Sequence, residues 1–267
     1  EVPGLNEPTT GLTMGQAAEK LAKELGISRN EQDEFALKSH QNAAKAIESG
    51  IFKDEVTPCY PAPKFEVVDK DTDIRADASL EIMSSLKPAF DREFGTITAA
   101  NASFLTDGAS ATLIMSESKA KELGLTPLAF IKADAAQGVD LQKENLFMGP
   151  AYCIPKVLKI AGMELKDISA IEMHEAFAAQ VLGNVKCLES KEFAVKNLGR
   201  SLAVGEVDRN QLNVYGGSIS LGHPFGATGS RLVNTLSKRM ARENLSTGLI
   251  SVCAAGGLAM AMILERS

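Results

Sequence analysis

The sequence contains no tryptophan, and its three tyrosines and eleven phenylalanines keep the aromatic fraction at 5%. Lysine and arginine together number 28 against 34 aspartates and glutamates, which gives a formal net charge of −6. Because nucleic-acid binding relies on a basic field and often on aromatic stacking, this composition argues against a nucleic-acid partner. With 267 residues, 45% of them hydrophobic, the chain is typical of one large or two ordinary globular domains.

Cysteine is also scarce. Cys59, Cys153, Cys187 and Cys253 lie far apart, without the close pairs that metal knuckles and dithiol motifs require. We therefore expect a reduced, cytosol-like compartment. The sequence shows no charged-then-apolar leader, so we expect no export signal. The longest apolar run, residues 249–264, is shorter than the ~20 residues that span a bilayer, which predicts buried strand instead of a membrane segment.

The first third of the chain predicts two helices followed by an irregular stretch. Residues 15–25 have apolar side chains at helical spacing and stop at Gly26, a residue suited to a left-handed helix cap. Ser28 and Glu31 form a capping box for a second helix that we expect to run to Gly50. Residues 51–78 combine prolines and mixed charges without a clear period, which predicts a long extended excursion.

Beyond Pro127 the pattern changes to alternating strands and helices, which is typical of an α/β fold. We expect a strand at 128–134 and helices at 150–162, 175–188 and 231–243. The small residues that follow Val252 interrupt the last apolar run. We therefore expect two buried strands there, joined by a turn that holds Cys253.

Three segments place polar, titratable groups in glycine-rich or apolar surroundings. His223 lies among the five glycines of residues 214–229, which favours close approach of the backbone to a ligand, and equally fits a turn that leads into the next helix. Cys253 is either a reactive thiol or an inert small hydrophobe. His174 and Glu175 begin a predicted helix, where Glu175 suits the helix dipole and His174 is either functional or exposed at the surface.

Taken together, these segments resemble the thiolase family. The stretches HEAFAAQ, GGSISLGHPFGATGSR and CAAGGLAMAMILE, in this order and near this spacing, look like the carboxyl-terminal thiolase signatures. The resemblance continues upstream in GLTMGQAAEKLA and LKPAFDREFGTITAANASFLTDGASA and covers essentially the whole chain. The HEAFAAQ form, where many thiolases have Asn before the Glu, is similar to the β subunits of multifunctional fatty-acid β-oxidation complexes.

The resemblance implies a layered αβαβα thiolase fold from which most of the amino-terminal domain is absent. Residues 1–106 would be the loop domain that covers the CoA site, 107–127 the last strand and helix of the amino-terminal domain, and 128–267 the carboxyl-terminal domain. In such thiolases the nucleophilic cysteine lies in a further amino-terminal stretch that has no counterpart here. We therefore expect this sequence to be a carboxyl-terminal portion that is inactive alone.

The activity implied is that of acetyl-CoA C-acyltransferase, a transferase that uses CoA to cleave 3-ketoacyl-CoA into acetyl-CoA and a shortened acyl-CoA in lipid degradation. By the resemblance, His223 takes the thiol proton and donates a hydrogen bond to the developing oxyanion. Cys253 is the group expected to have a near-neutral pKa and to shuttle a proton. The backbone N–H of Ala255 would supply an oxyanion donor, and His174 would fix a water or donate directly opposite His223.

Further positions match substrate contacts of the family. The CoA-binding candidates are Arg75 near the adenine nucleotide, Ser103 on the pantetheine arm, and the apolar Met14, Phe90 and Phe177. Each has an ordinary alternative, because Met14 and Phe90 also fit a core and Arg75 also fits a solvated loop. Thr13, where short-chain biosynthetic thiolases resemble one another in having His, favours the degradative branch.

The resemblance implies no cofactor, since CoA is a substrate, and no metal. The expected partners are 3-ketoacyl-CoA, CoA, a second copy of the chain, and an α subunit with hydratase and 3-hydroxyacyl-CoA dehydrogenase activity. We expect a bacterial cytoplasmic protein, with the mitochondrial matrix as the alternative. Two other function classes stay open, namely a non-catalytic acyl-CoA or lipid carrier and an interaction subunit on a thiolase-like scaffold.

Overall fold

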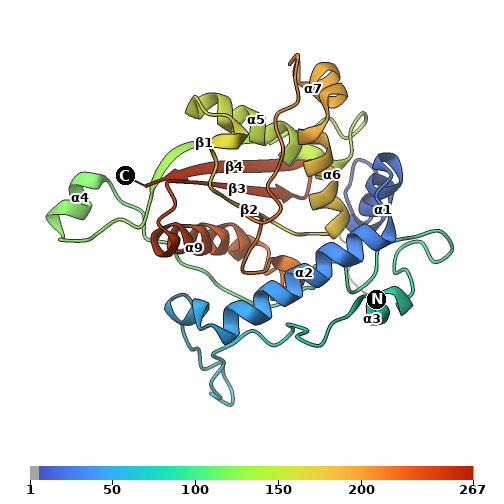
Figure 1. Cartoon of the computed structure of the whole chain (residues 1–267). Helices are drawn as coiled ribbons and strands as arrows, with labels where there is room; N and C mark the ends of the chain where they lie inside the picture. Colours follow the sequence, from blue (N-terminus) through green and yellow to red (C-terminus); the bar gives the residue numbers. More distant parts are fainter. Residues whose placement is uncertain (1–5, 267) are drawn as a thin grey trace.

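The computed structural model describes residues 6–266, and its centre is a four-stranded sheet with helices on both faces (Figure 1). The strands are β1 (Phe130–Gly138), β2 (Ala170–Met173), β3 (Thr247–Ala254) and β4 (Leu258–Glu265), in the order β1-β4-β3-β2. Strand β4 pairs antiparallel with both β1 and β3, whereas β2 runs parallel to β3. Because parallel neighbours need a crossover connection, the chain between β2 and β3 forms helices before it returns to the sheet.

One face of the sheet is covered by α5 (Gly149–Ala161) and α6 (Ala178–Glu189), and the other by α9 (Gly226–Glu243) (Figure 1). On the first face, side chains of α5 and α6 pack against alternate residues of all four strands. On the second face, one stripe of α9 contacts Ala170, Ile250 and Leu264. The α/β prediction is therefore confirmed, and the core lies in two layers on either side of the sheet.

The two amino-terminal helices form as the sequence predicts. Helix α1 (Met14–Leu25) ends at Gly26, whose φ of 60° is left-handed. Helix α2 (Arg29–Glu48) begins with the capping box, in which Ser28 Oγ accepts from the Glu31 N–H and the Glu31 carboxylate accepts from the Ser28 N–H. Both helices pack against α6 and so lie beside one end of the sheet (Figure 1).

Short elements complete the described part of the chain. They are the helices α3 (Leu80–Ser85), α4 (Glu117–Glu122), α7 (Lys191–Leu198) and α8 (Ser218–Leu221), and the 3-10 turns η1 (Ile51–Asp54), η2 (Leu146–Met148) and η3 (Leu165–Asp167). Residues 55–79 form the expected irregular excursion. Among residues 6–266, no helix is both long and apolar enough to cross a bilayer.

Two local predictions at Cys253 and Glu175 are wrong. Cys253 belongs to β3 and pairs with Ala259, so the turn between β3 and β4 lies beyond it. Glu175 does not begin a helix, because α6 starts only at Ala178. The strand pairing of Cys253 and the burial of Glu175 override the local sequence signals at both positions.

Residues 107–127 contain the expected helix, α4, but residues 107–116 form no strand. Within residues 6–266 no strand lies alongside this segment to hydrogen-bond with it, and Leu113 is 79% exposed. The segment instead contacts α9 through side chains, since Thr112 Oγ1 donates to Asn234 Oδ1 at 2.8 Å. The domain boundaries at 106 and 127 stay predictions.

Candidate active site

The candidate site begins where β2 ends. The backbone N–H of His174 donates to the Ser251 carbonyl of β3 at 2.8 Å, which extends the parallel pairing by one residue. His174 is 1% exposed, so the alternative of an exposed histidine is wrong. The ends of two neighbouring parallel strands therefore place His174 close to the strand that carries Cys253.

His223 reaches the same place from the glycine-rich segment before α9. The ring centroids of His174 and His223 are 4.1 Å apart, with the ring planes tilted by 37°. Each ring is held at Nδ1 by a hydroxyl group, because Ser218 Oγ lies 2.8 Å from His174 Nδ1 and Thr228 Oγ1 lies 2.7 Å from His223 Nδ1. Two histidines from distant segments of the chain thus lie side by side, each in a fixed orientation.

Both histidines are neutral at physiological pH. Burial first, and then the electrostatic influence of the neighbouring His223 and Arg231, hold the pKa of His174 well below its usual range. Burial and Arg231 lower the pKa of His223 to about 4. A neutral imidazole can accept a proton at one nitrogen and donate a hydrogen bond from the other, which are the two abilities expected of a general base and an oxyanion donor.

Cys253 lies in an apolar cluster with Phe147, Ala176 and Phe177. Burial raises the pKa of the Cys253 thiol to about 12, so the thiol is protonated at neutral pH. The expectation of a proton shuttle with a near-neutral pKa therefore does not describe this structure. A protonated thiol is nevertheless the form that can donate a proton.

A buried carboxylate holds the loop between β2 and α6 in place. Glu175 accepts hydrogen bonds from Asn213 Nδ2 at 2.6 Å, Ser39 Oγ at 2.8 Å and the Ile219 N–H at 3.1 Å. A Cβ at position 217 would lie 2.1 Å from the Glu175 carboxyl carbon, so only glycine fits there. These contacts join α2, the Asn213 loop and α8 to the residue that follows His174.

Charged groups lie behind the histidines on the α9 side of the sheet. Burial raises the pKa of Glu172, one strand position before Met173, to about 8, and neither of its carboxyl oxygens has a hydrogen-bond partner among the described residues. Arg231 acts electrostatically on Glu172 and on both histidines, and its Nη2 donates to Ser218 Oγ at 3.1 Å. Four carboxyl groups interact with Arg231 electrostatically: Glu172, Glu175, Asp71 and Glu55.

Most of the apolar substrate candidates lie together. Phe177 is buried, and its ring packs edge-on against Phe90 at 6.2 Å between centroids. Met14 packs against the cluster that contains Cys253 and Phe177. The backbone N–H of Ser103 donates to the Ala176 carbonyl at 2.9 Å, which places Ser103 beside the HEAFAAQ segment. These four positions are therefore connected to the histidine loop through Ala176 and Phe177.

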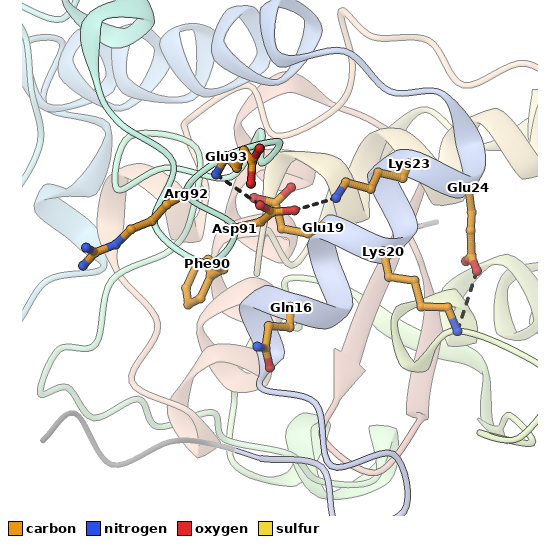
Figure 2. Close-up of a pocket in the computed structure, with 9 residues that line it drawn as sticks. All are labelled: Gln16, Glu19, Lys20, Lys23, Glu24, Phe90, Asp91, Arg92 and Glu93. Carbon is orange, nitrogen blue, oxygen red and sulfur yellow. Dashed lines mark hydrogen bonds and ion pairs between the residues drawn. The ribbon is translucent and has the colours of Figure 1, made fainter.

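Phe90 also lines a groove of about 680 Å³ between α1 and residues 90–93 (Figure 2). Basic side chains such as Lys23 alternate there with acidic ones, and Lys23 Nζ pairs with Asp91 at 2.6 Å. Because the charges of this groove are mixed, it does not supply the concentrated positive charge that CoA phosphates would favour.

Arg75 and Ala255 lie at the surface. The Arg75 side chain is 65% exposed and pairs with Asp73 at 3.3 Å, while its backbone N–H donates to His40 Nδ1 at 3.1 Å. Ala255 is exposed in the turn between β3 and β4. Arg75 thus forms an exposed ion pair, as expected of an ordinary charged residue in a solvated loop. Ala255 lies two residues beyond Cys253.

Sequence reasoning missed the residues that hold the two histidines. The motif GGSISLGHPFGATGSR contains Ser218, Thr228 and Arg231. It therefore predicted the segment but not which side chains these three residues contact. Asn213 and Ser39, which bind Glu175, carry no signal in the sequence because their contacts form only in the fold. In the part of the chain that the structure describes, no cluster of histidine, cysteine and carboxylate side chains is suited to a metal ion.

Comparisons with known proteins agree with this fold. The family model described as "Thiolase, N-terminal domain" matches residues 1–118, and "Thiolase, C-terminal domain" matches residues 125–266. A 3-ketoacyl-CoA thiolase of Photobacterium profundum is 50% identical over 263 residues, which make up 98% of this chain and 60% of that protein. The chain therefore spans about three fifths of the length of the curated relatives it matches.

Solved structures match equally broadly. The Bacillus anthracis acetyl-CoA acetyltransferase superposes with a TM-score of 0.86 at 40% identity, covering 98% of this chain and 62% of that one. Human mitochondrial 3-ketoacyl-CoA thiolase in complex with CoA gives a TM-score of 0.82 at 33% identity, covering 98% of this chain and 61% of that one. Sequence and fold agree along the whole described chain, and the protein belongs to the thiolase family.

Proposed function

We propose that this chain is part of a 3-ketoacyl-CoA thiolase, an acyltransferase that cleaves 3-ketoacyl-CoA with CoA to acetyl-CoA and a shortened acyl-CoA. The observation that carries the proposal is the contact of His174 with His223 at 4.1 Å, beside the strand that contains Cys253. The names of the relatives at about 50% identity support the same reaction and do not favour a carrier or an interaction subunit.

The reaction we propose has two halves. A cysteine thiolate adds to the 3-keto carbon, the bond between carbons 2 and 3 breaks, and its electron pair leaves on acetyl-CoA, which takes up a proton. The thiol of CoA then adds to the acyl-cysteine thioester and releases the cysteine and acyl-CoA. His223 serves as base and oxyanion donor in the first half, and the Cys253 thiol donates the proton to the leaving carbanion.

The acylated cysteine in this proposal lies outside the 267 residues. A nucleophilic cysteine needs a lowered pKa, whereas burial raises the pKa values of Cys153 and Cys187 to about 11 and about 12. Cys59 lies exposed in the irregular excursion, opposite Val68. None of these three has the surroundings of an activated nucleophile. The implied substrate is CoA itself, so the proposal needs no separate cofactor.

The finer parts of the proposal concern setting and partners. We place the enzyme in fatty-acid β-oxidation, as a homodimer that associates with an α subunit carrying hydratase and 3-hydroxyacyl-CoA dehydrogenase activity. We place it in the bacterial cytoplasm, with the mitochondrial matrix as the alternative. The support is the HEAFAAQ form of the motif and Thr13, which N-caps α1.

The test is a thiolysis assay with acetoacetyl-CoA or a longer 3-ketoacyl-CoA plus CoA, in which loss of the enolate absorbance is followed. We expect no turnover from the 267-residue chain alone and turnover from the complete encoded protein, whose length and intact mass are measured in parallel. Turnover by the 267 residues alone would overturn the placement of the nucleophile and point to Cys59, Cys153 or Cys187. An inactive complete protein would overturn the proposed reaction.

A further inference from the structure

A chain of hydrogen bonds leads from α9 to the first of the two histidines. Arg231 Nη2 donates to Ser218 Oγ at 3.1 Å, and Ser218 Oγ lies 2.8 Å from His174 Nδ1. Ser218 is fully buried, and these two contacts are the hydrogen bonds of its hydroxyl group within the described residues. The hydroxyl group therefore connects a permanent donor with one ring nitrogen of His174.

The donor inventory decides which way these bonds run. Arginine has donors only, so Ser218 Oγ accepts from Arg231 and keeps its single O–H to donate elsewhere. If His174 Nδ1 carried a proton, it would also donate to Ser218, and the serine O–H would be left without an acceptor in a buried place. The Ser218 hydroxyl group is satisfied as both acceptor and donor when it donates to an unprotonated Nδ1.

We propose that Arg231 is a positioning residue that acts through Ser218 to fix His174 in the tautomer with its proton on Nε2. The two nitrogens of an imidazole ring point in different directions, so Nε2 faces away from Ser218. His174 then carries its N–H donor at Nε2, on a ring whose centroid lies 4.1 Å from that of His223. That this donor serves substrate rests on the proposed function, whereas the tautomer itself does not.

The surroundings of His174 keep its ring neutral, so only one of its two nitrogens carries a proton. The ring is buried and neutral, so a single nitrogen carries hydrogen and the two tautomers are the only alternatives. Arg231 Nη1 is buried without a hydrogen-bond partner in the described chain. The hydrogen bond from Nη2 to Ser218 therefore contributes directly to holding the guanidinium group in place.

The test is nitrogen-detected NMR of the 267-residue chain labelled with 15N-histidine. The chain contains three histidines, and His40 is an internal reference because its Nδ1 accepts a hydrogen bond from the Arg75 N–H. For His174, assigned by its loss in His174→Gln, we expect a pyridine-type shift at Nδ1 and a pyrrole-type shift at Nε2, the same pattern as His40. A pyrrole-type Nδ1 of His174 would overturn the proposal.

Variants then test the role of Arg231 and Ser218. We expect Ser218→Ala and Arg231→Met to give mixed tautomers at His174, and Ser218→Thr, which keeps a hydroxyl, to retain the Nε2–H form. Ser230→Ala is the matched control, because Ser230 lies next to Arg231 but bonds to Ser110 and Thr112. An unchanged His174 tautomer in folded Ser218→Ala and Arg231→Met would overturn the proposal. A complete protein without thiolase activity would leave these spectra unaffected, so the two failures are distinguishable.

Discussion

Strand β2 presents different chemistry to the two faces of the sheet. Ile171 and Met173 lie in the apolar cluster under α5 and α6. Successive side chains of a strand alternate between faces, so Glu172 lies on the opposite side, with Ala170 and α9. His174, one residue beyond the strand, continues that second side toward Ser218 and Arg231.

The difference shows where buried charged groups gather in this fold. The cluster under α5 and α6 is apolar at the centre of the sheet, and the same face buries Ser251 and, near the end of β3, Cys253. On the α9 face, apolar packing around Leu232 and Leu236 gives way near the end of β2 to buried charges and the two histidines. Within residues 6–266 the Glu172 oxygens and Arg231 Nη1 are buried without hydrogen-bond partners, which costs free energy that packing elsewhere has to offset.

The largest effect is expected on thiolysis, from substitution of a histidine of the candidate site. In the complete enzyme, we expect His223→Ala to lower kcat/KM by ~10²- to 10⁴-fold, the usual loss for one positioned acid, base or oxyanion donor. The thiolysis assay measures it, with Ser230→Ala as a control for changes at the start of α9. A loss smaller than about threefold would remove His223 from the mechanism.

The next effect concerns the buried carboxyl group of the α9 face. The pKa of Glu172 is about 8 in the folded chain against 4.5 for an ordinary glutamate, so between these pH values the folded state holds a proton that the unfolded chain has released. The contribution of Glu172 is therefore fully present below pH 4.5 and is lost as pH rises from there through 8, about 5 kcal/mol in all.

Urea unfolding at several pH values measures this contribution, with Glu172→Gln as the variant. Glu175, Glu55 and Asp71 have raised pKa values and act in the same direction, while the lowered pKa values of the histidines favour the folded state as pH rises through the acidic range. The difference between the wild type and Glu172→Gln isolates Glu172. Parallel curves for the two proteins would show that Glu172 keeps its ordinary pKa.

The apolar face should respond through stability alone. Leu249 is fully buried there, and we expect Leu249→Ala to lower the free energy of unfolding by about 2–5 kcal/mol through lost burial and a cavity. Leu113→Ala, at a side chain that is 79% exposed, is the matched control with an expected change below about 0.5 kcal/mol. A changed His174 tautomer in Leu249→Ala would show that the two faces are not separate.

The smallest effect is expected outside both faces. Asp91→Asn removes the exposed pair with Lys23 at the groove of Figure 2 and should change the free energy of unfolding by less than about 1 kcal/mol. Urea unfolding at low and high salt checks it. A loss above 2 kcal/mol would mean that this groove contributes to the core of the fold.

Much of this arrangement is predictable from local sequence. The caps at Ser28 and Gly26 specify helix ends through contacts within a few residues, and the apolar run of residues 249–264 predicts the last two strands. The motifs pointed to His174, His223 and Cys253, but not to the pairing that puts Cys253 in a strand. The binding of Glu175 by Asn213 and Ser39 depends on residues far apart in the chain, so no local pattern carries it.

The central claim is that His223 and Cys253 act on different steps around a cysteine outside these 267 residues. The most direct measurement is the intact mass of the complete protein after incubation with acetyl-CoA, followed by peptide mapping of the modified cysteine. We predict an acetylated cysteine in the wild type and in Cys253→Ala, no acetylation in His223→Ala, and loss of thiolysis in both variants. An acetyl group on Cys253, or normal acetylation of His223→Ala, would contradict the account.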